Sequence, residues 1–403
     1  MNRIALAQKE TAVRDTRIAT LRPIYLDHHS TTPVDPRVAA IVLDTMVNAF
    51  GNANSVDHTH GEAAMDLVER ATAEVADLTG SDVSGVRFTS GSTESIRLAI
   101  GHAIAMRGGR ALRIAATTVE HQAVLDAIGI GVRSGLAEVL WVDVDAEANV
   151  RPESLQAALR ESVDLVCVMA ANNEVGTIYP IEQIARDVHL AGGKILVDGT
   201  QAVGRVDLRV TDWDLDYLAF SSHKIYGPKG VGALAVAGND VHTEITARVL
   251  GHDGTLNVPG IAGFGEACRL IGLEGVGDEK RVRASRDRLE ARLLRDLPGI
   301  VVNGNRGNRL AHNLHISLPG LPNDAVIGRL RNKVAVSTGA ACSSGAQTPS
   351  HVLKAMGLSE EMQEGAIRIG LGKYTTQDEV DCAADEIVAA AREVAESMQG
   401  VRG

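Results

Sequence analysis

The chain has 403 residues, of which 45% are hydrophobic, 23% are charged and 3% are aromatic, and its formal net charge is −11. This length allows two domains with a large core, and the composition is ordinary for a cytoplasmic α/β protein. The acidic balance argues against direct binding of nucleic acid or of a bilayer surface, because both need clustered positive charge, and no apolar run is long enough to span a membrane.

The start of the chain and its cysteines exclude two further classes. Residues 1–22 mix charged side chains without an apolar centre, so we expect a partly disordered tail and no secretory signal. The four cysteines show neither C-x-x-C pairing nor zinc spacing. We therefore expect no disulfide framework and no metal site.

From residue 86 to residue 236, short apolar strands alternate with amphipathic helices. We expect strands at 86–89, 112–116, 139–142, 165–169 and 195–197, and helices at 93–107, 123–130, 152–160 and 181–190. Strands this apolar are buried on both faces, which predicts an α/β fold with a mainly parallel sheet sandwiched by helices. Ligands of such sheets lie beyond the carboxyl ends of the strands.

Beyond residue 265 the pattern changes to a smaller α+β domain. We expect a long charged helix at 278–297, strands at 312–318 and 335–337, and a terminal helix at 378–398. The predicted division is a tail at 1–22, a large cofactor-binding domain at 35–266, and a small domain made of 23–34 and 267–403.

The most informative stretch is 215–232, in which an apolar strand ends in a Ser-Ser-His-Lys run that finishes at Lys224. A lysine there, flanked by hydroxyls and imidazole, is suited to forming a Schiff base, because partial desolvation lowers the pKa of an amine. Another apolar strand ends in Asp198. The two residues fit the anchors of pyridoxal phosphate (PLP), the aspartate on the pyridinium nitrogen and the lysine on the aldehyde. The alternative is an ordinary surface lysine.

The run 88–95 is typical of a strand, a turn of small residues and a helix start. Free N–H groups and the helix dipole favour an anion at such a turn, and Ser90, Ser92 and Thr93 add hydroxyl donors suited to phosphate. The alternative is that these hydroxyls only cap the helix.

Two other polar groups follow predicted strands. His121 could lie on the cofactor ring and shuttle protons, and Asn173 could bond the phenolic oxygen of the ring or the substrate. The alternatives are a capping or core histidine and a simple turn.

The run 336–349 is small, polar and rich in glycine, which predicts a mobile surface loop. Cys342 is unusual in such a loop, because free cysteine is normally buried, and an exposed thiol there suits a nucleophile that must travel. Cys167 lies in an apolar strand, and Cys268 and Cys382 lie in helical patterns, so we expect those three in the core.

Arg368 lies within the apolar run 366–372. A half-buried arginine needs an anionic partner, which a substrate carboxylate would provide in a bidentate pair. The alternative is a structural salt bridge.

Together these motifs resemble the cysteine desulfurases of the iron–sulfur-assembly type, the long-loop (group I) branch of the class V aminotransferase-like, fold-type I PLP enzymes. The resemblance starts at 25–27, 31–33 and 50–52, runs through the segments above, and covers nearly the whole chain after the tail. It implies conversion of L-cysteine to L-alanine, with a persulfide left on Cys342 and then passed to an acceptor.

The resemblance also implies a role for each matching residue. Lys224 would hold the cofactor and remove the α-proton of the substrate, and Asp198 would pair with the pyridine nitrogen. His121 would stack on the ring and deprotonate the substrate thiol or Cys342. The other positions are the phenolic-oxygen partners Gln201 and Asn173, the phosphate ligands Thr93, Ser221 and His223 with Thr255 of the neighbouring subunit, and the substrate ligands Arg368, Asn52 and Asn173.

One stretch departs from the family pattern. The family usually has a His-Gly-Gly-Gly-x-Glu stretch before an Arg-x-Gly-Thr element, whereas residues 247–255 lack the glycine run and His252 stands where the arginine would be. The role of Thr255 depends on this altered segment.

Two other hypotheses stay open. One is a related PLP C–S or selenocysteine lyase in which Cys342 is dispensable, and the other is a scaffold that keeps the fold without turnover. The partners implied for a desulfurase are L-cysteine, a second copy of the chain in a homodimer, and a sulfur-acceptor protein of iron–sulfur assembly, tRNA thiolation or DNA phosphorothioation.

Overall fold

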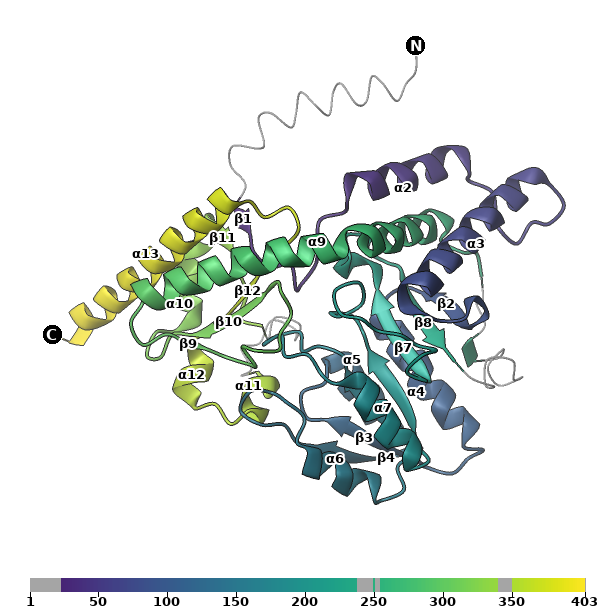
Figure 1. Cartoon of the computed structure of the whole chain (residues 1–403), viewed down its shortest axis with the longest axis horizontal. Helices are drawn as coiled ribbons and strands as arrows, with labels where there is room; N and C mark the ends of the chain where they lie inside the picture. The colour runs from purple at the N-terminus through teal and green to yellow at the C-terminus, as the bar shows by residue number, and fades with distance from the viewer. Residues whose placement is uncertain (1–22, 238–248, 251–253, 340–349, 403) are drawn as a thin grey trace, which may run out of the picture.

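A computed structural model describes residues 23–237, 249–250, 254–339 and 350–402. A large sheet with its helices and a smaller α+β part lie side by side, and one long helix, α9 (Val258–Asp296), runs across both (Figure 1). The predicted tail at 1–22 lies outside the described residues. Within the described residues, no helix is both long enough and apolar enough to cross a membrane.

The large sheet has seven strands in the order β2-β8-β7-β6-β5-β3-β4. All neighbouring pairs are parallel except those made by β8, which is antiparallel to β2 and to β7. The strands are β2 (Val86–Thr89), β3 (Leu112–Thr117), β4 (Ala137–Val142), β5 (Leu165–Met169), β6 (Lys194–Asp198), β7 (Tyr217–Ser221) and β8 (Gly232–Val236). The predicted mainly parallel sheet is therefore confirmed.

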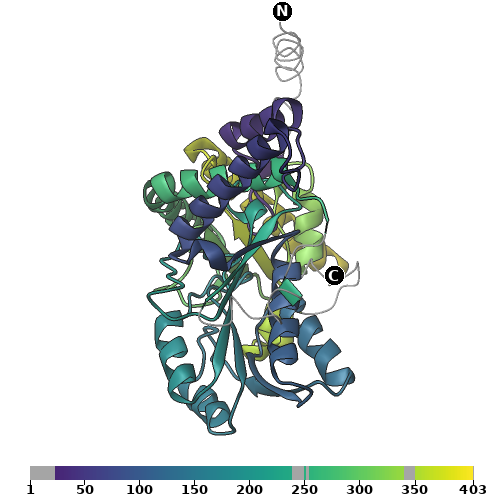
Figure 2. The same ribbon diagram turned by 90° about the vertical axis from the view of Figure 1, so that its right-hand side faces the viewer.

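Helices cover both faces of this sheet (Figure 2). Successive side chains of β5 point to opposite faces, so Cys167 packs with α4 and α5 while Val166 and Val168 join the core under α3, α6, α7 and α9. The helices are α2 (Pro36–Asn48), α3 (Thr59–Thr79), α4 (Ser92–Met106), α5 (Gln122–Arg133), α6 (Pro152–Leu159) and α7 (Ile181–Leu190).

The smaller part has a core of its own, built on the second half of α9. Its sheet has the antiparallel order β12-β10-β9, and a short parallel pair, β1 with β11, lies beside it. The elements are β1 (Ile24–Tyr25), β9 (Val301–Val302), β10 (Asn313–Ser317), α10 (Asn323–Leu330), β11 (Val334–Ala335), α11 (His351–Ala355), α12 (Glu360–Glu364), β12 (Ala366–Gly370) and α13 (Gln377–Arg402).

The prediction of a helix at 278–297 was wrong about where it begins. Helix α9 begins at Val258, where the side chain of Asn257 accepts from the N–H of Gly260 and Pro259 lies in the first turn. Its glycines lie where other elements pack too closely for a side chain. A Cβ added at Gly265 would meet Ala71 Cα at 2.5 Å, and one added at Gly263 would meet Val42 at 2.5 Å. Tertiary packing thus outweighs the poor helix propensity of glycine.

The predicted division between residues 266 and 267 falls inside α9. Leu270 packs in the core of the large sheet, and Val282 packs in the smaller core. Helix α11, assigned from the sequence to the small domain, also packs on the large core through Val352 and Leu353. The two parts therefore share a continuous helix, with no linker between them.

Candidate active site

A cavity of about 220 Å³ lies at the carboxyl ends of the large parallel strands, beside the smaller part. It is lined by His29, Ser30, Ser92, Thr93, His121, Met169, Ala171, Asn173, Asp198, Thr200, Gln201, His223, Lys224 and Arg368. Nine of the residues singled out from the sequence are thus together, because the ends of parallel strands meet at one edge of a sheet. Ser221 is buried beside this cavity, with its Oγ 3.7 Å from the place where a Cβ on Gly91 would lie.

Lys224 ends a short 3₁₀ turn, Ser222–Lys224, that directly follows β7. Its Nζ donates to the carbonyl oxygens of His29 at 2.5 Å and Ser30 at 2.7 Å. The surface-lysine alternative is therefore wrong, since the amine lies in the cavity wall and is held by main-chain acceptors.

Asp198 is the last residue of β6, and its side chain is almost completely buried. Its carboxylate accepts from the N–H of Thr200 at 3.0 Å and from the Thr200 hydroxyl. Behind it, burial and then the charge of Asp198 raise the pKa of Glu120 to about 8, although Glu120 accepts from the Thr117 hydroxyl. The two neighbouring carboxyls therefore differ in environment, and Asp198 is the one that faces the cavity.

His121 is the N-cap of α5. Its Nδ1 accepts from the N–H of Ala123 at 3.1 Å, so the neutral ring carries its proton on Nε2. In this geometry Nε2 donates, and the ring can take up a second proton only by giving up the cap bond at Nδ1. His121 therefore caps a helix, as the alternative predicted, and it also lines the cavity. Its place on a cofactor ring and its part in proton transfer stay predictions.

The sequence did not reveal His29, which fixes the side chain of Gln201. The amide nitrogen of Asn313 donates to His29 Nε2 at 3.0 Å, so the proton of the ring is on Nδ1, which lies 3.4 Å from Gln201 Oε1. Gln201 Nε2 in turn donates to His29 O at 3.0 Å. Burial holds the pKa of His29 well below its usual value, so the ring stays neutral and keeps these roles. Its position two residues after Asp27, in the Tyr-Leu-Asp segment, was the available signal.

The predicted anion site lies at the start of α4. Gly91 is the N-cap residue, with φ 153°, and Ser92 and Thr93 lie in the first helical turn, so their hydroxyls do not cap it. His223 lies across the cavity with its Nδ1 3.1 Å from Thr31 Oγ1. Burial, followed by the charge of Lys224, lowers the pKa of His223 to about 4. A helix start facing the cavity fits an anionic group of a ligand.

Arg368 lies on β12 and is 2% exposed. Its guanidinium donates to Asp27 Oδ1 at 3.0 Å, to Ser30 Oγ at 2.8 Å and to Asn173 O at 3.0 Å. Its Nε is buried and has no partner among the described residues. Arg368 therefore forms a salt bridge with Asp27, as the alternative predicted. A substrate carboxylate bound to Arg368 would share the guanidinium with Asp27.

Cys342 and the rest of 340–349 lie outside the described residues, as does most of the loop expected to be mobile. The two ends of this stretch are described, and both lie at Glu174, next to Asn173. Ser350 Oγ donates to Glu174 Oε2 at 2.5 Å, and a Cβ added at Gly339 would lie 3.2 Å from the same oxygen. The chain therefore leaves and re-enters the described structure at the rim of the cavity.

Three other predicted positions differ from this picture. Asn52 and Thr255 are exposed and are not among the residues that line the cavity, although their neighbours Asn54 and Gly254 are hydrogen-bonded at 3.3 Å. The altered segment 247–255 is described only at 249–250 and 254–255. The expectation of a core position for Cys382 was wrong, because it lies on the solvent-facing side of α13, whereas Cys167 and Cys268 are buried.

Comparison with known proteins identifies the family. The aminotransferase class-V model matches residues 24–382. The chain belongs to the class-V aminotransferases. The resemblance stated from the sequence is confirmed.

Individual relatives narrow the likeness within this family. The chain is 42% identical over 366 residues, 89% of this chain and 90% of the relative, to a cysteine desulfurase IscS of Anaeromyxobacter sp. (strain Fw109-5). A solved NifS-like protein superposes with a TM-score of 0.83 at 32% identity, covering 91% of this chain and 98% of that chain. SspA, solved in complex with cysteine, superposes with a TM-score of 0.74 at 28% identity, covering 88% and 100%.

Membership in the class-V aminotransferases implies pyridoxal phosphate as the cofactor. The residues present fit that group, since the cavity combines an amine, a buried carboxylate and a helix start. Within the described residues there is no cluster of His, Cys, Asp and Glu that could hold a metal ion.

Because several imidazoles are buried and neutral, the cofactor-free protein should lose stability as the pH falls from about 6.5 to about 4. Burial lowers the pKa of His28 to about 4. The unfolded chain therefore binds this proton more readily, and the stability that the neutral ring contributes is lost as the pH falls through that window. Urea unfolding at about pH 7 and about pH 5 measures the decline.

His28→Phe should make this decline smaller, since it keeps a ring and removes the titrating group. His60→Phe is the control, because His60 is exposed. Equal declines in the two variants would contradict the assignment to His28.

Proposed function

We propose that this chain is a PLP-dependent cysteine desulfurase that converts L-cysteine to L-alanine and leaves the sulfur as a persulfide on Cys342. One observation carries the proposal. Asp198 and Arg368 lie on different strands, Lys224 follows a third strand, and all three line the same cavity. Both ends of the segment that holds Cys342 lie at the rim of this cavity. The curated relatives named cysteine desulfurase support the same activity.

The residues would hold the cofactor from several sides. Lys224 would attach it covalently, Asp198 would pair with its ring nitrogen, and His121 would lie on its face. Gln201 and Asn173 would bond its phenolic oxygen, and the phosphate would be held by Thr93, Ser221 and His223, with Thr255 of the partner subunit. When bound, the cofactor supplies an electron sink for the α-carbon of the substrate.

Binding of L-cysteine would depend on Arg368, with Asn52 and Asn173 as further ligands. The guanidinium is already oriented by three hydrogen bonds, so little entropy is lost when it takes a carboxylate. The Lys224 amine, released by the substrate, would take the α-proton, because it lines the same cavity as Arg368.

Sulfur transfer would follow at Cys342. The thiolate attacks the sulfur of L-cysteine, so an S–S bond forms as the C–S bond breaks, and the carbon product takes up protons to become L-alanine. The overall balance is L-cysteine plus a thiol to L-alanine plus a persulfide. His121 would exchange the thiol proton, and it would lose its cap bond to Ala123 when it takes that proton up.

A homodimer is part of the proposal. Helix α2 and the turn after it expose Leu43, Met46, Val47 and Phe50, an apolar group that a second copy would cover. Thr255 is exposed near this region, as a residue contributed to a partner's site must be. The sulfur acceptor is proposed to be a protein, and a cytoplasmic location stays a prediction.

Lys224→Ala should abolish alanine production and the attachment of PLP to the protein, because no other amine lines the cavity among the described residues. Borohydride reduction followed by mass spectrometry measures the attachment. Lys229→Ala is the control, since Lys229 is exposed in the turn that follows. PLP still reduced onto Lys224→Ala would refute the role of this lysine.

Asp198→Asn should fold normally yet lose about 100-fold or more in rate, because an amide does not favour a protonated ring nitrogen as a carboxylate does. Alanine production and circular dichroism test the two parts of this statement. Asp207→Asn is the control, because it changes an exposed carboxylate in the segment that follows β6. A near-normal rate for Asp198→Asn would make Asp198 a structural residue only.

Cys342→Ser should still bind PLP and L-cysteine but should carry no persulfide, because a hydroxyl is a far poorer attacker of sulfur than a thiolate. Mass spectrometry after incubation with L-cysteine should find the extra sulfur on the peptide that holds Cys342. Cys382→Ser is the control, since Cys382 is exposed on α13. Sulfide release at the normal rate by Cys342→Ser would favour a C–S or selenocysteine lyase.

A further inference from the structure

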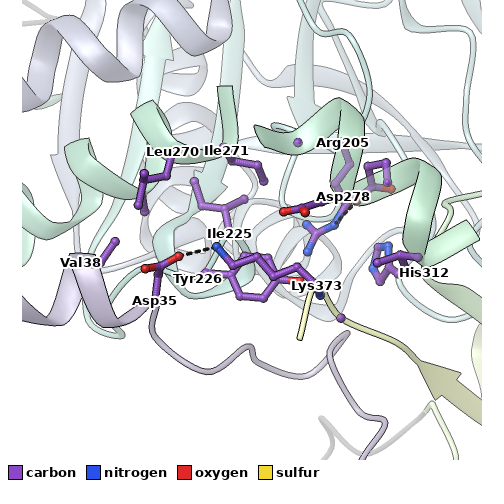
Figure 3. Close-up of a pocket in the computed structure, with 15 residues that line it drawn as sticks. Asp35, Val38, Arg205, Ile225, Tyr226, Leu270, Ile271, Asp278, His312 and Lys373 are labelled. Carbon is purple, nitrogen blue, oxygen red and sulfur yellow. Dashed lines mark hydrogen bonds and ion pairs between the residues drawn. The ribbon is translucent and has the colours of Figure 1, made fainter. Parts of the chain in front are cut away.

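Behind Lys224 the structure buries a second cation that the family comparison does not explain. Arg205 follows Gln201 in the turn after β6, and its side chain is only 3% exposed. It lines a small pocket with Tyr226, His312 and Lys373, between α9 and the smaller part (Figure 3). This pocket lies outside the cavity described above, since Arg205 does not line that cavity.

The guanidinium of Arg205 makes one strong contact. Its Nη2 donates to the main-chain carbonyl of Lys224 at 2.7 Å, and its Nε lies 3.5 Å from Glu279 Oε1 on α9. Its Nη1 is buried and has no partner among the described residues. Burying a cation whose hydrogen bonds are incomplete destabilises the folded protein, so a buried arginine at this place calls for a functional explanation.

Two glycines allow Arg205 to reach this carbonyl. Gly204 has φ 76°, and a Cβ there would meet Ile271 Cδ1 at 2.7 Å. A Cβ on Gly275 would lie 2.9 Å from the carbonyl oxygen of Gly204. The turn is therefore pressed against α9 with no side chain between the two backbones, which aims the side chain of Arg205 at Lys224.

We propose that Arg205 is a positioning residue for Lys224: it fixes the main-chain carbonyl of the lysine from behind, and so sets where the amine enters the cavity. The inference rests on the proposed function, in which Lys224 holds the cofactor. The same turn begins at Asp198 and carries Gln201, so one segment places three groups. Glu279 and the close contact at Gly204 anchor that segment to α9.

The electrostatics of the pocket agree with this role. Burial is the main reason that the pKa values of His29 and His312 are well below the usual range, and the charge of Arg205 lowers both further. The two rings are stacked, with centroids 4.2 Å apart. A neutral His29 keeps its hydrogen bond with Gln201, so Arg205 also supports a second cofactor contact.

The test uses full-length apoprotein and PLP. Arg205→Met should attach PLP about 10-fold more slowly, because the Lys224 amine is misplaced. Borohydride reduction and mass spectrometry measure the attachment. The variant should lose kcat by a similar factor, while KM for L-cysteine changes little because Arg368 keeps its position. Arg205→Lys, which keeps the charge but not the planar fork, should restore the attachment rate only in part. Arg209→Met is the control, since Arg209 is a half-exposed partner of Asp207.

The outcomes separate this inference from the proposed function. If the unaltered protein does not attach PLP at all, the proposed function is wrong. If it does, and folded Arg205→Met attaches PLP at the same rate with the same kcat, the positioning role is wrong. Should Arg205→Met not fold, Arg205→Lys decides: a rate equal to that of the unaltered protein overturns the inference, and a slower rate with an unchanged urea midpoint supports it.

Discussion

The Lys224 amine is held by the main-chain carbonyls of His29 and Ser30, which lie 195 and 194 residues earlier in the chain. The segment that holds them reaches both parts of the molecule. Asp27 pairs with Arg368 of the small sheet, and the N–H of Thr32 donates to the carbonyl of His223 at 3.0 Å. The turn at His29 and Ser30 thus bonds Lys224, Gln201 and Arg368, and a shift of this turn would move the three side chains together. The division into two domains therefore stops at the site, where the parts act as one unit.

Helix α9 imposes a second constraint from behind. Its glycines let α3 and the turn at Gly204 lie against it with little space between the backbones. Each glycine costs helix stability, and the loss is offset by the burial of the surrounding apolar surface. The same helix packs in the smaller core at Val282. It therefore fixes the elements behind the site relative to the smaller part. Arg205 and Glu279 are the polar contact at the middle of the helix.

Charges around the cavity are arranged by burial. Imidazoles such as His29 and His223 are kept neutral, so each ring has one donor and one acceptor, and hydrogen-bond directions are defined. Burial also raises the pKa of Glu174, whose carboxyl accepts a hydrogen bond from the Ser350 hydroxyl at the rim of the cavity. The charges that face the cavity directly are those of Asp198, Lys224 and Arg368, the groups that the proposed chemistry uses. Under the proposed function, these fixed charges would face an anionic cofactor and the carboxylate of an amino acid.

The sequence by itself determined the parallel sheet and nine of the residues that line the cavity. It could do so because short, continuously apolar strands are local patterns, and because the ends of parallel strands meet at one edge wherever the chain runs between them. Only the tertiary structure decided the length of α9, the sharing of Arg368 with Asp27, and the roles of His29, Glu174 and Arg205. Each of these depends on contacts between residues far apart in the chain, where packing outweighs local propensity, so no pattern within a short window could reveal it.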